Sequence, residues 1–213
     1  QYPIESRMSP VGRLAPSLIV NADAYTAVDR ADTDAEAAWR ANAEGPGVLA
    51  GYCAAAGIPL IQVSTDYVFD GDKGVPYVES DAPNPIGVYG ASKLAGERAV
   101  LEAGARAIVL RTSWVYSAVG RNFVLTMLNA AHKTDRLRVV GDQIGCPTAT
   151  PDLAAAILAI ADRLAAGGWR SEFGTVLHAA GSVWTSWHGL ADAVFAGGSG
   201  HDATVPVVEA ITT

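Results

Sequence analysis

A tyrosine and a lysine spaced four residues apart, Tyr89 and Lys93, form the sharpest chemical motif in the sequence. On a helix, residues at this spacing share one face. A phenol with its ordinary pKa near ~10 is a poor proton donor at neutral pH, and a nearby ammonium lowers that pKa toward the working range. A hydroxyl opposite, from Thr65, would hold a carbonyl against Tyr89. This arrangement predicts carbonyl reduction, in which hydride comes from a nicotinamide and Tyr89 supplies the proton.

Polar and aromatic residues follow three of the predicted strands. They occupy residues 21–26, 64–67 and 112–116. In open α/β sheets, ligands bind beyond the carboxyl ends of the strands. We therefore expect these segments to line one polar, aromatic cleft. The Tyr89–Lys93 spacing alone is a weak signal, because any amphipathic helix can carry it by chance, and the neighbouring segments strengthen it.

The elements that must position these residues are short apolar runs alternating with longer alanine-rich runs. The predicted strands are 18–20, 60–64, 107–111, 137–140 and 176–178. The predicted helices are 34–56, bent near 45–47, then 89–102, 122–132 and 151–164. Asp34 and Gly57 would cap the first helix at its start and end. This alternation predicts an α/β fold with a doubly wound, Rossmann-like parallel sheet. Between the second strand and second helix, residues 70–87 are expected to form a binding loop.

The composition excludes several classes of protein. Half of the 213 residues are hydrophobic and 17% are charged, which excludes disorder as the main state. A formal net charge of −7 argues against nucleic-acid binding, because phosphate backbones attract basic surfaces. No apolar run reaches the ~18–20 residues of a membrane helix, and no secretory signal is visible. The cysteines and histidines form no metal-binding cluster. We therefore expect a cytoplasmic protein with no membrane partner, no nucleic-acid partner and no metal site of its own.

Several segments, in the right order, resemble the extended short-chain dehydrogenase/reductase family. Besides the Tyr89–Lys93 motif they are 21–29, 63–71, 83–90, 111–116, 120–123 and 142–148. The resemblance covers roughly residues 17–196 and is far more specific than any single motif. It implies a reductase that uses NADPH or NADH and acts on a dTDP-4-keto-6-deoxy sugar.

The resemblance also implies roles for the matching residues. Tyr89 is then the proton donor, Lys93 lowers its pKa and binds the nicotinamide ribose, and Thr65 orients the keto oxygen. Cofactor contacts are expected from Ala22, Ala24, Tyr25, Ser64, Tyr89 and Lys93. Substrate contacts are expected from Thr65, Asp66, Tyr67, Trp114, Arg121 and Asn122, the last two at the diphosphate. The loop at Asp142 and Gln143 would help to close the substrate side.

The implied organisation is a dinucleotide-binding domain and a smaller C-terminal substrate-binding lobe. The first comprises residues 1–116 and 151–180, and the second comprises residues 117–150 and 181–213. A homodimer is compatible with the resemblance, and so is Mg²⁺ at a subunit contact, although no ligand cluster in the sequence points to a metal.

The sequence departs from the family's pattern at its start. The family opens with a strand, a G-x-x-G-x-x-G turn and a helix, which bring backbone close to the cofactor pyrophosphate. Residues 1–16 hold only Gly12, and the glycine-rich residues 197–200 follow no strand. We therefore expect a fragment, or a sequence from which parts at both ends have been removed. Asp23 is a second departure, since the family generally has a small apolar residue there.

Other interpretations stay open at this point. Trp114 could be a core residue, Arg121 a surface charge and Asp66 the cap of a turn. A related nucleotide-sugar epimerase or dehydratase would turn over without net NAD(P)H consumption. A non-catalytic regulatory subunit would reuse the fold. Asn42 either hydrogen-bonds backbone near the active site or lies on an ordinary helix surface.

Overall fold

The computed structural model describes residues 14–197 and 205–213. The chain divides into two compact units, one comprising Gln1–Thr112 with Ile157–His178 and the other Ser113–Ala156 with Ala179–Thr213. Gly12 and most of the glycine-rich segment at 197–200 lie outside the described residues. The predicted dinucleotide-binding and substrate-binding roles of the two parts stay predictions.

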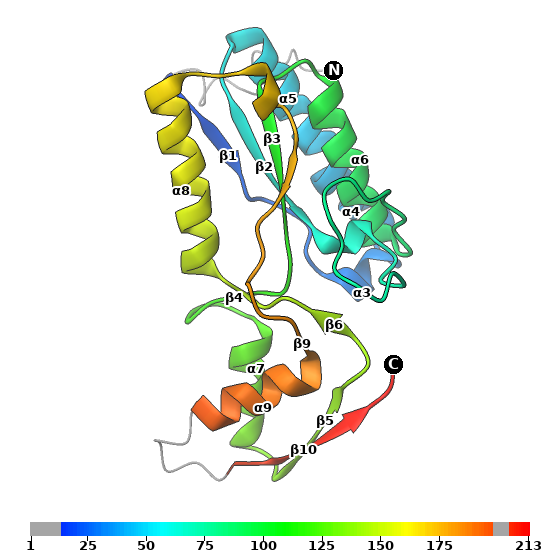
Figure 1. Cartoon of the computed structure of the whole chain (residues 1–213). Coiled ribbons are helices and arrows are strands. Elements are labelled where there is room, and N and C mark those ends of the chain that lie inside the picture. Colours follow the sequence, from blue (N-terminus) through cyan, green and yellow to red (C-terminus); the bar gives the residue numbers. More distant parts are fainter. Residues whose placement is uncertain (1–13, 198–204) are drawn as a thin grey trace. The chain divides into compact units, whose positions relative to one another are not determined.

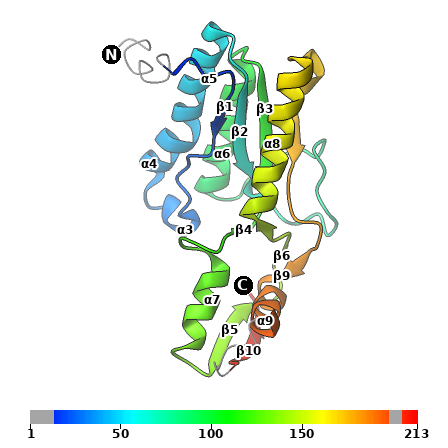
Figure 2. The same cartoon turned by 90° about the vertical axis from the view of Figure 1, so that its left-hand side faces the viewer.

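The first unit is built on a parallel sheet. Its strands, in spatial order, are β1 (Ile19–Asn21), β2 (Leu60–Thr65), β3 (Ala107–Thr112) and β8 (Val176–His178). All neighbouring pairs are parallel, with Thr65 opposite Thr112 and Arg111 opposite His178. The helices α5 (Gly45–Ala56) and α6 (Val88–Glu102) cover one face, and α8 (Thr150–Gly167) covers the other (Figures 1 and 2). The predicted doubly wound parallel sheet is thus confirmed.

The first long predicted helix is interrupted by one wide turn. Helix α3 (Val28–Ala31) comes first, and then α4 (Ala35–Trp39) continues through a π-helical turn, Arg40–Glu44, into α5. Pro46 has no N–H to give to the carbonyl of Asn42, and its ring would clash with that carbonyl, so the helix widens there. The predicted irregularity therefore lies just before residues 45–47. Gly57, at φ 67°, ends α5 as predicted.

Asp34 lies at the predicted N-cap position, before α4, but its side chain does not cap the helix. Its carboxylate accepts instead from the Tyr25 hydroxyl, at 3.2 Å, and pairs with Arg30. Competition from these two partners explains why the side chain turns away from the helix end.

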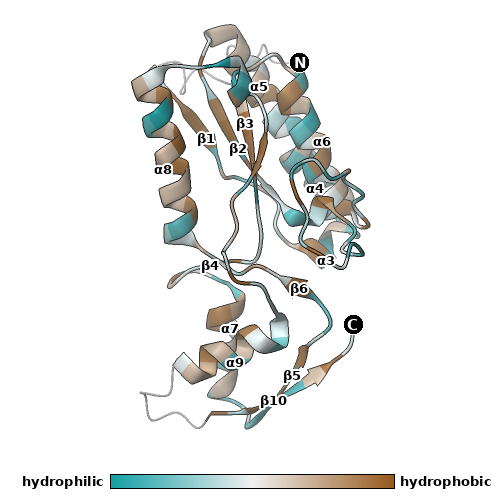
Figure 3. Ribbon diagram, in the orientation of Figure 1, coloured by the Kyte–Doolittle hydropathy of each residue, from teal (hydrophilic) through white to brown (hydrophobic). Residues whose placement is uncertain are grey.

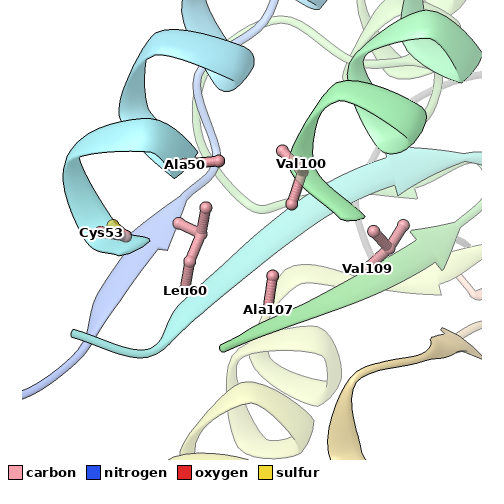
Figure 4. Packing of buried hydrophobic residues seen from close by; sticks show 6 residues of the cluster. All are labelled: Ala50, Cys53, Leu60, Val100, Ala107 and Val109. Carbon is pink, nitrogen blue, oxygen red and sulfur yellow. The ribbon is translucent and has the colours of Figure 1, made fainter. Parts of the chain in front are cut away.

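Apolar side chains fill the space between the sheet and helices α5 and α6 at the amino ends of β2 and β3. Figure 4 shows this cluster, whose members are all at most 1% exposed: Ala50, Cys53, Leu60, Val100, Ala107 and Val109. The strands are brown along most of their length in Figure 3, as expected for a sheet buried on both faces. This cluster stabilises the amino ends of the strands whose carboxyl ends carry the polar residues.

The segment after β2 starts with a short 3-10 helix, Asp66–Val68, and then runs without further regular structure to α6. Asp70 organises it: its carboxylate accepts from the Tyr77 hydroxyl and from the Asn84 amide. These hydrogen bonds hold the pKa of Asp70 down, to about 2. Glu79 accepts from the backbone N–H of His178 at the end of β8. The predicted loop at 70–87 is therefore ordered by its own side chains.

The described residues of the second unit form paired short strands, the helices α7 and α9, and the start of α8. The strands are β4 (Val115–Tyr116), β5 (Arg136–Val140), β6 (Ile144–Gly145), β7 (Thr148–Ala149), β9 (Thr185–Ser186) and β10 (Val207–Ile211). They pair as β4 with β7, β5 with β10 and β6 with β9. Helices α7 (Phe123–Ala131) and α9 (Trp187–Gly197) pack with the β5–β10 pair around Val139, Ala191 and Phe195. Among the described residues, no helix combines the length and apolar character needed to cross a membrane.

Candidate active site

One face of α6 carries three polar residues at four-residue spacing, and three successive residues at the end of β2 contact them. The Lys93 ammonium donates to the Val63 carbonyl at 2.8 Å. The Ser64 hydroxyl donates to the Glu97 carboxylate. Thr65 hydrogen-bonds with the Tyr89 phenol. We call this set of contacts the β2–α6 seam; it confirms that Tyr89, Lys93 and Thr65 gather at one place.

The Tyr89 phenol is half-buried at the open end of this seam. Burial raises its pKa above the ordinary value, the hydrogen bond with Thr65 lowers it, and the negative charges of Asp66 and Tyr67 raise it again. The net shift is upward, which is opposite to the predicted shift. Burial outweighs every other effect, and the charges that act on the phenol come from Asp66 and Tyr67 rather than from Lys93. Tyr89 is therefore protonated at neutral pH, and it is a weaker acid than an ordinary phenol.

Lys93 is only 5% exposed. Burial lowers the pKa of its ammonium to about 8, and the charges of Glu97 and Asp23 act in the opposite direction. Desolvation disfavours the charged form of an amine, which explains the direction of the main effect. Lys93 consequently changes charge close to the working pH range.

Thr65, Asp66 and Tyr67 form a tight turn at the end of β2. The Thr65 hydroxyl donates to Asp66 and accepts from the Tyr67 backbone N–H, each at 3.2 Å. The Tyr67 ring meets the Tyr89 ring edge-on, with centroids 5.5 Å apart. Burial raises the pKa of Asp66 to about 6. The turn thus places a carboxyl that titrates near neutrality beside the Thr65 hydroxyl.

A buried ion pair, which the sequence interpretation missed, lies behind the seam. Arg111 donates to Glu97 through Nε, at 2.9 and 3.2 Å, and through Nη2, at 2.6 Å. The two residues are 5% and 2% exposed. Two signals could have found this pair: Glu97 continues the four-residue spacing of Tyr89 and Lys93, and Arg111 is a charge inside an apolar strand.

Asn42 links the wide turn to the segment after β1 and to α6. Its side-chain oxygen accepts from the Tyr25 N–H at 2.9 Å, and its amide donates to the Tyr25 carbonyl and to the Ser92 hydroxyl. A Cβ at Gly96 would lie 2.0 Å from the Asn42 carbonyl oxygen, so only glycine permits this approach. Of the two roles considered for Asn42, the structure shows the one that hydrogen-bonds backbone near the site.

The residues predicted to line a cofactor groove behave in different ways. Ala22 is exposed and Ala24 and Tyr25 are half-buried after the carboxyl end of β1. Ser64 is 3% exposed, and its hydroxyl faces Glu97. The Ser64 side chain therefore holds α6, and the cofactor contact expected from Ser64 stays a prediction. Asp23 acts on Lys93 electrostatically, so its carboxylate lies on the side of the seam.

Three predicted substrate residues belong to the second unit. Trp114 has a left-handed φ of 45° and stacks on Trp187, with centroids 3.5 Å apart. A Cβ at Gly145 would lie 2.3 Å from the Trp114 ring, so a glycine is needed beneath the indole. The left-handed backbone of Trp114 is typical of functional sites, where strained residues are common. Its stacked indole is equally typical of a core residue, so both roles considered for Trp114 stay open.

Arg121 and Asn122 lie at the start of α7. The Asn122 side chain caps this helix, because its oxygen accepts from the Leu125 N–H at 3.1 Å and its amide donates to the Ser117 carbonyl. Arg121 is exposed. In the loop after β5, Asp142 accepts from Thr213 and Gln143 accepts from the Trp187 indole N–H. The substrate contacts assigned to these residues stay predictions.

Within the described ranges, no group of three or more His, Cys, Asp or Glu residues is placed to hold a metal ion.

A parallel α/β sheet with a tyrosine, a lysine and a threonine at its carboxyl edge defines a Rossmann-like protein of the extended short-chain dehydrogenase/reductase type. Within this class, the model of the family described as RmlD substrate binding domain matches residues 5–213. The chain belongs to this family.

Individual relatives carry a consistent name. A dTDP-4-dehydrorhamnose reductase from Sinorhizobium fredii is 46% identical over 187 residues, which cover 88% of this chain and 63% of that protein. Another from Mycobacterium tuberculosis is 49% identical over 183 residues, 84% of this chain and 58% of that protein. The crystal structure of dTDP-4-dehydrorhamnose reductase from Bacillus anthracis in complex with NADP has a TM-score of 0.89 at 33% identity, covering 99% of this chain and 71% of that one. The chain thus spans about 60% of the length of the two curated relatives.

Proposed function

We propose that the protein containing this chain reduces the C4 keto group of dTDP-4-dehydro-L-rhamnose with NAD(P)H, giving dTDP-L-rhamnose, and that Tyr89 donates the proton. The observation that carries the proposal is the β2–α6 seam, which brings a protonated phenol, a threonine hydroxyl and a buried ammonium together. The names of the relatives, one of which is an NADP complex, supply the substrate and the cofactor.

The residues around the seam fit a nicotinamide cofactor. An ammonium has three hydrogens, and Lys93 gives one to the Val63 carbonyl, so up to two remain for the hydroxyls of a ribose. Ala22 and Ala24 present small side chains where β1 ends, the edge at which ligands of such sheets bind. When bound, NAD(P)H supplies the hydride.

The protein's own residues perform the remaining steps. The Thr65 hydroxyl orients the keto oxygen beside the phenol. Tyr89 is protonated at neutral pH because burial raises its pKa, so it can donate its proton to the alkoxide oxygen that forms. The Lys93 ammonium, seated on the Val63 carbonyl, hydrogen-bonds the ribose of the nicotinamide.

Replacing Tyr89 tests this mechanism in the full-length polypeptide. The assay is NAD(P)H oxidation in the presence of the keto-sugar nucleotide. Tyr89→Phe should lose about 10²–10⁴-fold in rate, because that is the contribution of a positioned acid. Tyr52→Phe, in the apolar cluster of α5, is the matched control and should keep full activity. Unchanged turnover in Tyr89→Phe would remove this phenol from the mechanism.

One observation favours a second candidate, a nucleotide-sugar epimerase or dehydratase. Such chemistries need a further acid–base group beside the threonine, and the Asp66 carboxyl, with its pKa raised to about 6, lies there. The two candidates differ in their stoichiometry. Product formed at constant NAD(P)H absorbance would support the epimerase or dehydratase, whereas one NAD(P)H consumed per product would support the reductase.

A non-catalytic subunit differs from both enzymes in cofactor binding. Calorimetry of the full-length polypeptide with NADPH and NADH separates this case. Both enzymes should bind one of the two nucleotides, and an absence of binding would indicate a subunit that reuses the fold.

A further inference from the structure

The β2–α6 seam contains a residue that the mechanism has not used. Glu97 follows Lys93 by four residues, so both side chains lie on one face of α6. Val63 and Ser64, adjacent on β2, receive them separately: the Val63 carbonyl takes the ammonium, and the Ser64 hydroxyl donates to the carboxylate. The two side chains are therefore each fixed by one of two neighbouring residues of β2.

Glu97 has little freedom to turn away. Arg111 grips both of its carboxylate oxygens, at distances between 2.6 and 3.2 Å, and Ser64 holds one of them. The guanidinium in turn lies over the Phe69 ring, 5.0 Å from its centre. A charge fixed in this way, away from solvent, acts on its neighbours more strongly than a mobile surface charge.

Lys93 is the neighbour whose charged form depends most on such a carboxylate. Burial disfavours its ammonium, and few groups oppose this effect: Glu97 on α6 and Asp23 after β1. The Val63 carbonyl on β2 adds its dipole. Facing Glu97 itself are Arg111 and Ser64, and its charge also reaches His178 on β8.

We propose that Glu97 is a positioning residue that keeps the Lys93 ammonium charged and seated on β2, and that Arg111 and Ser64 hold Glu97 in place for this purpose. The inference rests on the proposed function only in assigning Lys93 to the reaction. Stability alone gives a weaker reason for the pair, because replacing a buried ion pair with well-packed apolar residues is often neutral or stabilising.

The titration of Lys93 can be followed directly. Lys93→Arg assigns the Lys93 signal in the spectrum of a protein labelled with ¹³C at lysine Cε, and the same substitution at Lys73 and Lys133 assigns the other lysines of this sequence. In the unaltered chain Lys93 should titrate at about pH 8. In Glu97→Gln its pKa should fall by about one unit, since a nearby opposite charge has been removed. Lys73 and Lys133 should not move.

Two further variants calibrate this result. Asp23→Asn should shift Lys93 in the same direction and by less, because Asp23 is the weaker of the two opposing charges. Glu102→Gln makes the same substitution at an exposed position of the same helix and should shift nothing. If Glu97→Gln does not fold because Arg111 is left uncompensated, the double variant with Arg111→Gln removes that charge and should still lower the pKa of Lys93.

An unchanged Lys93 pKa in a folded Glu97 variant would overturn the proposal, and so would an equal shift in Glu102→Gln. The titration needs neither cofactor nor substrate, so it succeeds or fails independently of the proposed reductase activity. In the active full-length polypeptide, the alkaline limb of kcat/KM should move to lower pH by the same amount in Glu97→Gln. A merely structural role for Glu97 would lower the rate and leave the position of that limb in place.

Discussion

The two ends of the first unit's sheet carry side chains of opposite polarity. At the amino ends of β2 and β3, the side chains facing α5 and α6 are apolar and at most 1% exposed, among them Leu60 and Ala107. At the carboxyl ends of the same strands, hydroxyls, an ammonium, a carboxylate and a guanidinium are buried nearly as deeply. The amino end contributes a burial free energy that grows with the apolar area removed from water, and the carboxyl end fixes charges and hydroxyls in defined places. We therefore expect mutations at the amino end to reduce stability and those at the carboxyl end to reduce activity.

The largest effect is expected from Leu60→Ala at the amino end. Leu60 is fully buried, so its truncation leaves a cavity and should lower the free energy of unfolding by about 2–5 kcal/mol. Urea denaturation measures this loss. The Lys93 titration should stay at about pH 8, because the seam lies at the other end of the strand. A shift of that titration would show that the two ends are not independent.

The complementary change is Thr65→Val at the carboxyl end of β2. The shape of the side chain is kept, but the hydroxyl that bonds with Tyr89, Asp66 and the Tyr67 N–H is lost. The rate should fall by about 10²-fold, as for the loss of one positioned donor in an active site. The loss of stability should be about 1 kcal/mol, the value of an ordinary hydrogen bond. A large loss of stability with full activity would reverse the comparison.

A smaller effect is expected where α6 approaches the wide turn. Gly96→Ala would bring a methyl group against the Asn42 carbonyl, and the resulting overpacking should cost about 1–3 kcal/mol. Gly51→Ala, on α5, is the matched control, since nothing lies within 4 Å of its added Cβ. Gly51→Ala should stabilise the protein by about 0.4–1 kcal/mol. Equal effects of the two variants would mean that α6 tolerates displacement.

The smallest effect is expected from Asp66→Asn, and it depends on pH. Because burial raises the pKa of Asp66 to about 6, the folded state binds more protons than the unfolded state between about pH 4 and 6. The contribution of Asp66 to stability is therefore full below that range and is lost as the pH rises through 6. Asp66→Asn should remove this dependence on pH. The change in the free energy of unfolding between pH 4 and pH 7 should shrink by an amount on the order of 1 kcal/mol. Denaturation at pH 4, 5, 6 and 7 would test this, and an unaltered slope would contradict it.

The sequence predicted the scaffold well and the electrostatics poorly. Apolar runs and glycine stops are local signals, so the parallel strands and the end of α5 at Gly57 were predictable. The gathering of Tyr89, Lys93 and Thr65 followed from spacing and from the rule for strand ends. The upward pKa shift of Tyr89 was not predictable, because it depends on burial that only the packed structure defines.

Long-range polar pairing was the other part that escaped prediction. Glu97 and Arg111 are separated by 14 residues and a helix end, and their partnership requires the register between α6 and β3. Ser64 alternates with its neighbours along β2, and its direction depends on which face α6 covers. The role of Asn42 depends on the turn at 40–44, which is wider than an α-helix and which the sequence did not predict. Each of these residues reads as ordinary when only its own segment is considered.

The wide turn at 40–44 has a consequence for chain length. An α-helix advances about 100° for each residue, so a shortening by one residue there would rotate α4 by that angle about the axis of α5. The Asn42 amide would then leave the Tyr25 peptide that it grips from both sides. The wide turn therefore sets the rotation of α4 about the axis of α5. Through Asn42 it also sets the path of the chain that leaves β1. Removing one residue from this turn is therefore expected to displace the chain where it leaves β1, beside the proposed cofactor site.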